Sequence, residues 1–198
     1  FNIGRRAGSI SPGYGRNGAR LRRRKQGNQE GGMEMATGKA AIFVDKIFQD
    51  MEVMYPYYRL IEAGFAVDLI GPEKGKVYNG KYGYPAMAGK SYPEARAEDY
   101  DLLVIPGGFA PDKIRMDRDA KRLTWEMVNG GKVVAAICHG PWVLVSAGVV
   151  KGRKLTSYIA IKDDVVNAGG LWEDSEVVVD GRLVTSRKPD DLPAFMKS

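Results

Sequence analysis

Short apolar runs alternate with amphipathic stretches from Lys39 to the end of the chain. Runs of β-branched and aliphatic residues that Gly or Pro interrupts predict strands buried on both faces. Stretches with apolar residues three or four positions apart predict helices. The predicted strands are Ala40–Val44, Phe65–Ile70, Leu102–Ile105, Val133–Ile137 and Lys154–Tyr158, and the predicted helices are Met51–Ala63, Asp117–Asn129, a short helix from Pro141, Ile161–Ala168 and a final helix from Asp190.

Two further segments complete the predicted architecture. Residues 73–99 have irregular Gly, Tyr and Lys spacing, which indicates short extended pieces and loop. Residues 176–186 predict a hairpin around the turn Asp180-Gly181. Alternating strands and helices predict an α/β fold with a mostly parallel sheet, helices on both faces and an added antiparallel hairpin. In such sheets, function lies at the carboxyl ends of the strands.

The chain contains one cysteine and one histidine, and they are adjacent. Cys138 and His139 follow the predicted strand Val133–Ile137 and precede Gly140-Pro141, so they lie at a strand-to-helix corner. The helix N-terminus is expected to lower the pKa of the thiol. Most lone cysteines are small buried hydrophobic residues, but the corner and the pairing favour a reactive thiol. Adjacent Cys and His lack the spacing of metal ligands.

Two other loops are expected at the same edge of the sheet. The backbone N–H groups of Gly107 and Gly108 can approach a ligand closely and, with the N–H of His139, form an oxyanion hole; the alternative is an ordinary strand-ending turn. Asp112 follows and could orient His139, or be a solvated acid. Gln49 and Glu52 follow the first strand, where an acid also suits a helix start.

Charge divides the chain into two parts. Residues 1–38 hold eight Lys or Arg and two acidic residues, a net charge of +6, whereas residues 39–198 are neutral with 22 of each sign. The first part is rich in Gly and Arg without apolar periodicity, which predicts disorder. One interpretation is a nucleic-acid-binding arm. The interpretation that we favour is that DNA upstream of the natural start encodes this segment, with natural translation starting at Met33 or Met35. Nothing in the neutral part indicates nucleic-acid binding.

Length and composition predict that residues 39–198 form one α/β domain with a well-buried core. A single cysteine excludes an intramolecular disulfide and suits a reducing compartment. No apolar run approaches the ~20 residues that span a bilayer, and the basic N-terminus lacks the apolar core of a secretory signal. The expectation is a cytoplasmic protein without a membrane partner.

From Lys39 to Phe195 the sequence resembles the PfpI family of intracellular cysteine proteases and protein deglycases. This family belongs to the class I glutamine-amidotransferase-like group, so the resemblance implies a flavodoxin-like three-layer sandwich. The segments that carry the resemblance are Tyr55–Leu60, Pro106–Asp112, Ala136–Pro141, Gly152–Tyr158, Ile161–Asp164 and Val177–Gly181. The ordered set is specific, although no single segment would be.

The resemblance also implies roles for individual residues. The family's nucleophile falls on Cys138 and its imidazole on His139, and the acidic third member falls on Asp112, supplied by a neighbouring subunit. The N–H groups of Gly108 and His139 become the oxyanion donors, and Tyr158 lies near the pocket. A homo-oligomer, with dimers assembling into larger rings and the site at an interface, is therefore implied.

Two positions depart from the family pattern. The family has a Glu after the first strand whose protonated carboxyl hydrogen-bonds the cysteine, and we assign that position to Gln49, with Asp50 and Glu52 beside it. A Gln can donate an N–H to a thiolate but cannot transfer a proton. The third member is Asp112 where Glu is typical, so its side chain is one methylene shorter.

These observations favour a cysteine-nucleophile hydrolase of the PfpI intracellular protease type, in which a thiolate attacks a peptide carbonyl. The first alternative is a protein deglycase or glyoxalase acting on glyoxal-type carbonyls or their adducts. The second is a non-enzymatic stress-response oligomer whose cysteine senses oxidation. No metal and no cofactor is expected.

Overall fold

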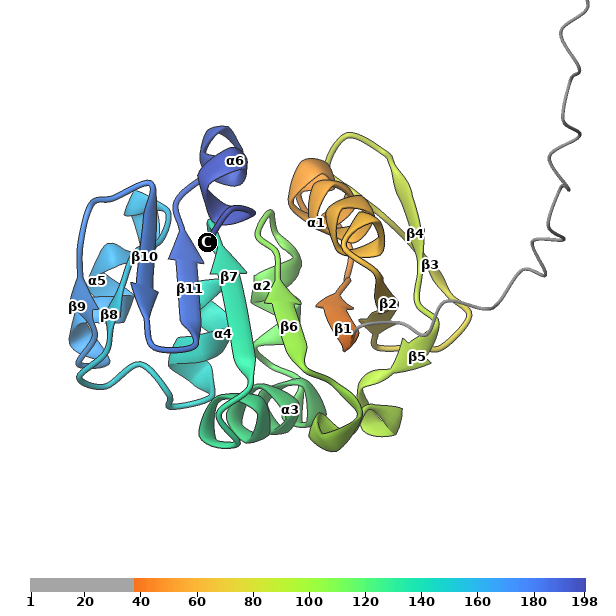
Figure 1. Ribbon diagram of the computed structural model, residues 1–198, viewed down its shortest axis with the longest axis horizontal. Helices are drawn as coiled ribbons and strands as arrows, with labels where there is room; N and C mark the ends of the chain where they lie inside the picture. Colours follow the sequence, from red (N-terminus) through yellow and green to blue (C-terminus); the bar gives the residue numbers. More distant parts are fainter. Residues whose placement is uncertain (1–37) are drawn as a thin grey trace, which may run out of the picture. The chain divides into compact units, whose positions relative to one another are not determined.

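The computed structural model describes residues 38–198 (Figure 1). The basic tail predicted for residues 1–38 lies outside the described residues except for Gly38, as do both candidate start methionines, Met33 and Met35. All that follows concerns the described part.

A seven-stranded sheet forms the centre of the domain, in the order β10-β11-β7-β6-β1-β2-β5. Every neighbouring pair is parallel except β10 and β11, which form the antiparallel hairpin. Two pairs of short strands, β3 with antiparallel β4 and β8 with parallel β9, lie outside the central sheet. The strands are β1 Gly38–Phe43, β2 Phe65–Gly71, β3 Val77–Asn79, β4 Pro85–Met87, β5 Lys90–Ser91, β6 Leu102–Ile105, β7 Val133–Ile137, β8 Lys154–Leu155, β9 Leu171–Trp172, β10 Val177–Asp180 and β11 Leu183–Ser186.

Helices cover both faces of the sheet (Figure 1). The α-helices are α1 Asp50–Glu62, α2 Ala110–Ile114, α3 Arg118–Asn129, α4 Pro141–Ser146, α5 Lys162–Asn167 and α6 Leu192–Phe195, and the 3₁₀ turns are Tyr92–Glu94, Ala97–Asp99, Ile159–Ile161 and Pro189–Asp191. The predicted α/β class, parallel sheet and hairpin are confirmed. The strand predicted over Lys154–Tyr158 is shorter, and α2 and β9 were not predicted.

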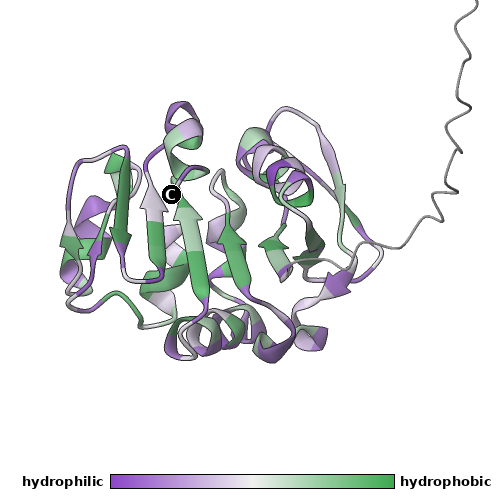
Figure 2. Ribbon diagram, in the orientation of Figure 1, coloured by the Kyte–Doolittle hydropathy of each residue, from purple (hydrophilic) through white to green (hydrophobic). Residues whose placement is uncertain are grey.

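Local sequence explains where the longer helices begin and which face they bury. The side chain of Asp117 accepts hydrogen bonds from the N–H groups of Asp119 and Ala120, at 2.8 and 2.9 Å, and so caps the start of α3. Leu123 and Met127, four residues apart on that helix, are fully buried. Hydrophobic residues gather on the strands in Figure 2, whereas the helices are mixed. The helices therefore pack one apolar stripe on the sheet.

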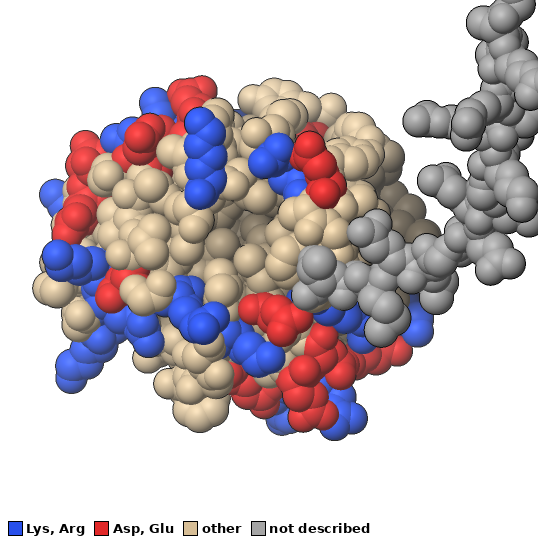
Figure 3. Space-filling model, viewed as in Figure 1, with Lys and Arg blue, Asp and Glu red and all other residues tan. Residues whose placement is uncertain are grey.

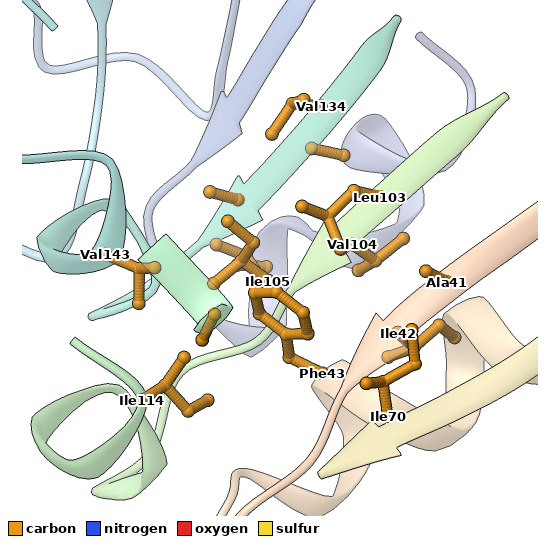
Figure 4. Close-up of a cluster of buried hydrophobic side chains, with 14 of the residues drawn as sticks. Ala41, Ile42, Phe43, Ile70, Leu103, Val104, Ile105, Ile114, Val134 and Val143 are labelled. Carbon is orange, nitrogen blue, oxygen red and sulfur yellow. The ribbon is translucent and has the colours of Figure 1, made fainter. Parts of the chain in front are cut away.

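The core between the sheet and its helices is built from aliphatic side chains around the aromatic ring of Phe43. Figure 4 shows side chains from β1, β6 and β7 meeting Ile114 of α2 and Val143 of α4. Phe43 and Tyr92 pack edge to face, with 5.3 Å between ring centroids. This packing fixes the three strands whose ends carry the candidate site.

The strand order reverses beside β1, because β2 lies on one side of it and β6 on the other. Such a reversal opens a crevice at the carboxyl ends of the strands, where ligands bind in open α/β sheets. The order β2-β1-β6-β7-β11 is that of a flavodoxin-like sheet. The loops after β1, β6 and β7 therefore meet at one edge.

The described residues carry charges of both signs, and Figure 3 shows Lys and Arg side chains interspersed with Asp and Glu on one face. Within residues 38–198 no helix has both the length and the apolar character that crossing a membrane requires.

Candidate active site

Cys138 lies at a strained turn between β7 and α4. Its φ of 63° is unusual for a residue other than glycine. The surrounding chain holds this conformation: the Cys138 N–H donates to the carbonyl of Ser186 at 3.0 Å, and the Cys138 carbonyl accepts from the N–H of Tyr158 at 2.9 Å. A Cβ at Gly140 would lie 2.3 Å from the carbonyl oxygen of Ile105, so only glycine fits there. The thiol is thereby presented at the carboxyl edge of the sheet.

A fully buried carboxyl, that of Glu52, lies beside the thiol. Its Oε2 accepts a hydrogen bond from the N–H of Gly107 at 2.7 Å. Its Oε1 is buried and, among the described residues, has no partner of standard hydrogen-bond geometry. The carboxyl also interacts with the Cys138 side chain. An oxygen without a donor favours the protonated carboxyl, which can then donate to the sulfur.

The assignment of Gln49 to the carboxyl position is therefore wrong. The side chain of Gln49 caps α1, since its Oε1 accepts from the N–H of Met51 at 2.8 Å. Glu52, one turn later, points into the core and occupies the place beside the thiol. A signal was available in the sequence: Glu52, Pro56 and Leu60 are spaced by four residues and form one buried stripe of α1. An acid on the apolar face of a helix is a candidate functional group.

The ionisation of the thiol is linked to that of the carboxyl. Burial raises the pKa of Glu52 to about 7, against the hydrogen bonds from Gly107 and Cys138. Burial, followed by the negative charge of Glu52, raises the pKa of Cys138 to about 12, although the N–H groups of Gly108 and His139 favour the thiolate. The expected lowering of the thiol pKa by the helix N-terminus is therefore wrong. A thiolate in this site requires that Glu52 hold a proton.

His139 contacts the thiol and is enclosed by aromatic rings. Its Nδ1 lies 3.3 Å from Sγ of Cys138. Tyr158 stacks on the imidazole at 5.0 Å, and Trp142 meets it edge-on at 5.4 Å. Burial lowers the pKa of His139, opposed by the charge of Asp112. This lowering favours the neutral imidazole.

The glycine pair after β6 faces the thiol, but its two N–H groups have different partners. The N–H of Gly107 is bonded to Glu52. The N–H of Gly108 faces the sulfur together with that of His139. Gly108 has a φ of 77° and forms an isolated bridge with Phe48, so the loop is fixed to the segment that leads into α1. Gly108 and His139 thus carry the donors that could hold an oxyanion.

These groups open into a cavity of about 460 Å³. Tyr158, predicted near the pocket, lines it, and so does Asp112. Asp112 is exposed, lies in α2 rather than in a loop, and makes no hydrogen bond to His139 within this chain. The lining residues are Gln49, Lys81, Tyr82, Gly108, Phe109, Asp112, Cys138, His139, Trp142, Tyr158, Lys188 and Pro189.

Half of this lining was not predicted from the sequence. Lys81 and Tyr82 come from the turn between β3 and β4, and Lys188 and Pro189 from the segment before α6. The apolar periodicity that identifies strands and helices says nothing about where such turns meet. Across residues 38–198, no group of three or more His, Cys, Asp or Glu side chains is arranged to hold a metal ion.

Several known proteins are similar to this chain in sequence and fold. The deglycase PfpI of Pyrococcus furiosus is 50% identical over 150 residues, which cover 76% of this chain and 90% of the relative. The protein/nucleic acid deglycase 2 of Escherichia coli is 45% identical over 159 residues, covering 79% and 92%.

Among solved structures, a two-domain protein of Anabaena variabilis with DJ-1/ThiJ/PfpI-like and ferritin-like domains superimposes with a TM-score of 0.79 at 41% identity. The match covers 80% of this chain and 46% of that protein. The sequence model of the DJ-1/PfpI family matches residues 38–198. The chain therefore belongs to the DJ-1/PfpI family.

Proposed function

We propose that this protein is a cysteine-dependent deglycase that acts on glyoxal-type carbonyls bonded to amines. The observation that carries the proposal is the pairing of the Cys138 thiol with Glu52, a buried carboxyl whose pKa is raised to about 7. Such a group can give a proton and take it back near neutral pH. The deglycase names of two relatives support the same class.

The reaction begins when Glu52 takes the proton of the Cys138 thiol, which leaves Glu52 protonated and Cys138 as the thiolate. Sγ forms a bond to the former aldehyde carbon of the adduct, the carbon–nitrogen bond breaks, and the amine leaves with the proton of Glu52. The N–H groups of Gly108 and His139 face the sulfur and are placed to stabilise negative charge on an attached oxygen. The product of this step is a hemithioacetal.

Glu52, now a carboxylate, removes the hydrogen of the carbon bonded to sulfur and returns it to the neighbouring carbonyl carbon. The first carbon is oxidised as the second is reduced, so no external electron acceptor is needed. Water then cleaves the resulting thioester to a hydroxy acid, and Glu52 regains its proton. Overall, one adduct and one water give one amine and one hydroxy acid.

A cysteine peptidase is the second candidate, because Nδ1 of His139 lies 3.3 Å from Sγ. Cysteine peptidases hold a thiolate beside an imidazolium. Here burial lowers the pKa of His139, which disfavours the imidazolium. A cavity of about 460 Å³ suits a small adduct or a single side chain. Both features favour the deglycase over the peptidase.

The test measures amine and lactate released from the adduct of methylglyoxal with N-acetylarginine, beside free methylglyoxal and unmodified peptides. Wild type should release amine and lactate in equal amounts. Cys138→Ser and Glu52→Gln should each lose at least a hundredfold in rate, because they lack the nucleophile and the proton carrier. Glu62→Gln is the matched control, since Glu62 is exposed on the same helix.

The alternatives give different results in the same experiment. Peptide cleavage that persists in Glu52→Gln would support the peptidase instead. Lactate formation in Cys138→Ser would contradict a thiol mechanism. No turnover on any substrate, with Cys138 oxidising to sulfinate under mild peroxide, would support the redox-sensing alternative.

A further inference from the structure

The orientation of His139 in this chain does not come from a carboxylate. A catalytic imidazole is usually held by a hydrogen bond from its second nitrogen to a carboxylate or carbonyl. Here Nδ1 contacts the thiol, and no residue in the described part of the chain hydrogen-bonds the other ring nitrogen. The ring is instead enclosed by Tyr158 on one side and Trp142 at its edge. What fixes these aromatic side chains also fixes the imidazole.

The indole of Trp142 is itself held by two residues, one in α5 and one directly after α2. Its Nε1–H donates to Oδ2 of Asp164, in α5, at 3.0 Å. The guanidinium of Arg115, which follows α2, lies 5.0 Å from the centroid of the indole. Arg115 is in turn held by Ser146 of α4, whose Oγ accepts from Nε at 2.9 Å. The indole therefore has a defined position relative to α4, α5 and the end of α2.

We propose that Trp142 and Asp164 are positioning residues for His139, with the Asp164 hydrogen bond holding the indole edge that keeps the imidazole against the thiol. This gives a role to the segment Ile161–Asp164, which the family resemblance singled out without a function. The effect on turnover rests on the proposed function, whereas the effect on His139 does not.

The chain offers a direct measurement, because His139 is its only histidine. The imidazole carbon-bound protons give NMR signals of one residue, so their titration reports the pKa of His139 alone. Burial is the largest cause that lowers this pKa. Releasing the indole admits water to the imidazole, and the pKa should rise toward the value of a free histidine, ~6.5.

Four variants separate the hydrogen bond from the charge. Asp164→Ala removes both, and Asp164→Asn keeps an acceptor oxygen but removes the charge. Asp163→Ala removes a charge at the adjacent exposed position of the same helix. Trp142→Phe keeps a ring but removes the N–H donor. Circular dichroism confirms the fold of each variant before titration.

The expected result is a rise of about 0.5 pKa unit, part of the ~1-unit spread of histidines in proteins, in both Asp164→Ala and Trp142→Phe. The variant that combines Asp164→Ala and Trp142→Phe should show no larger rise in the His139 pKa, because both substitutions break the same hydrogen bond. In Asp164→Asn the pKa of His139 should stay close to that of wild type, once the charge effect measured in Asp163→Ala is subtracted. With the methylglyoxal adduct, kcat should fall about tenfold at similar KM.

Two outcomes would overturn the proposal. The pKa of His139 in Asp164→Ala and Trp142→Phe could match that in Asp163→Ala, which would show that the indole does not hold the imidazole. Alternatively, the pKa of His139 could shift as far in Asp164→Asn as in Asp164→Ala, which would assign the effect to the lost charge rather than to the hydrogen bond. If the NMR shifts occur but wild type has no deglycase activity, the positioning role stands and the proposed function fails.

Discussion

At the scale of single residues, Glu52 links the chemistry of the site to the stability of the fold. Its pKa is about 7 when folded and 4.5 in its ordinary state. The folded protein therefore holds a proton that the unfolded chain loses between these values. Stability from this group is present below pH 4.5 and is lost as the pH rises through 7, by about 3 kcal/mol at ~1.4 kcal/mol per pKa unit.

We predict that Glu52→Gln removes this component of the pH dependence. The amide is neutral at every pH, so its unfolding free energy should not carry the decline between pH 4.5 and 7. Urea unfolding from pH 4.5 to 8, compared with Glu62→Gln, measures the difference. An equal decline in wild type and Glu52→Gln would show that Glu52 is already ionised at low pH in the folded protein.

Gly107 leaves the space in which the thiol and the carboxyl meet. An added Cβ would lie 2.6 Å from Cβ of Cys138, 2.7 Å from Oε2 of Glu52 and 2.9 Å from the N–H nitrogen of His139. Gly107→Ala should therefore destabilise the fold by roughly 2 kcal/mol and slow alkylation of Cys138 by iodoacetamide. The control is Gly89→Ala, whose Cβ meets nothing nearer than 3.8 Å. Equal behaviour of the two variants would contradict the close packing.

At the scale of elements, α1 fixes one wall of the cavity through Asp50, its first residue. The two carboxylate oxygens accept from the N–H groups of Tyr82 and Tyr84, each at 2.9 Å. Asp50 itself is buried. This carboxylate therefore holds the turn between β3 and β4, which carries Lys81 and Tyr82 into the cavity.

We predict that Asp50→Ala frees this turn while the sheet stays intact. The amides of Tyr82 and Tyr84 should lose their protection from hydrogen exchange, and the loss of stability should be about 1–3 kcal/mol. Weaker substrate binding should follow, because Tyr82 lines the cavity. Asp163→Ala, an exposed acid at the start of α5, controls for the loss of a helix N-terminal charge. Unchanged protection of both amides would contradict this role.

The sheet was predictable from the sequence because its strands are buried on both faces and read as uninterrupted apolar runs. β6 and β7 were predicted with their observed bounds. Short elements escaped prediction: α2 has five residues and β9 has two, too few for a period to show. Their positions depend on tertiary contacts rather than on local pattern.

The candidate site was predicted where it depends on neighbours in sequence and missed where it depends on distant ones. The adjacency of Cys138 and His139 is visible directly. The bond from Gly107 to Glu52 joins residues 55 positions apart, and position after the first strand alone does not choose between Gln49 and Glu52. Helical spacing does choose, since it places Glu52 on the buried stripe of α1.

At the scale of the whole molecule, several large apolar side chains of the described part are exposed, and two of them, Tyr82 and Phe109, line the cavity. Ile47, Met51, Tyr82, Phe109 and Met116 are each at least 47% exposed. We propose that a second copy of the chain covers them, with Asp112 close to the partner's site, as the family resemblance implies. Exposed apolar patches are typical of protein interfaces.

Met116→Glu should therefore lower the mass of the assembly measured by light scattering, because it places a charge in the interface. Val166→Glu is the control, since Val166 is 47% exposed on α5 and lies outside this group. A wild-type protein that is monomeric at micromolar concentration would contradict the proposal.

The hydrogen bonds of Cys138 have a consequence for biosynthesis. Its N–H is bonded to Ser186 and its carbonyl to Tyr158, while the carboxyl beside its thiol comes from Glu52. A ribosome releases these parts in order, so the nucleophile emerges long before the strand that holds its backbone. A nascent or prematurely terminated chain that lacks Ser186 therefore has Cys138 without this backbone hydrogen bond, and the setting that the proposed mechanism uses forms only after Ser186 has left the ribosome.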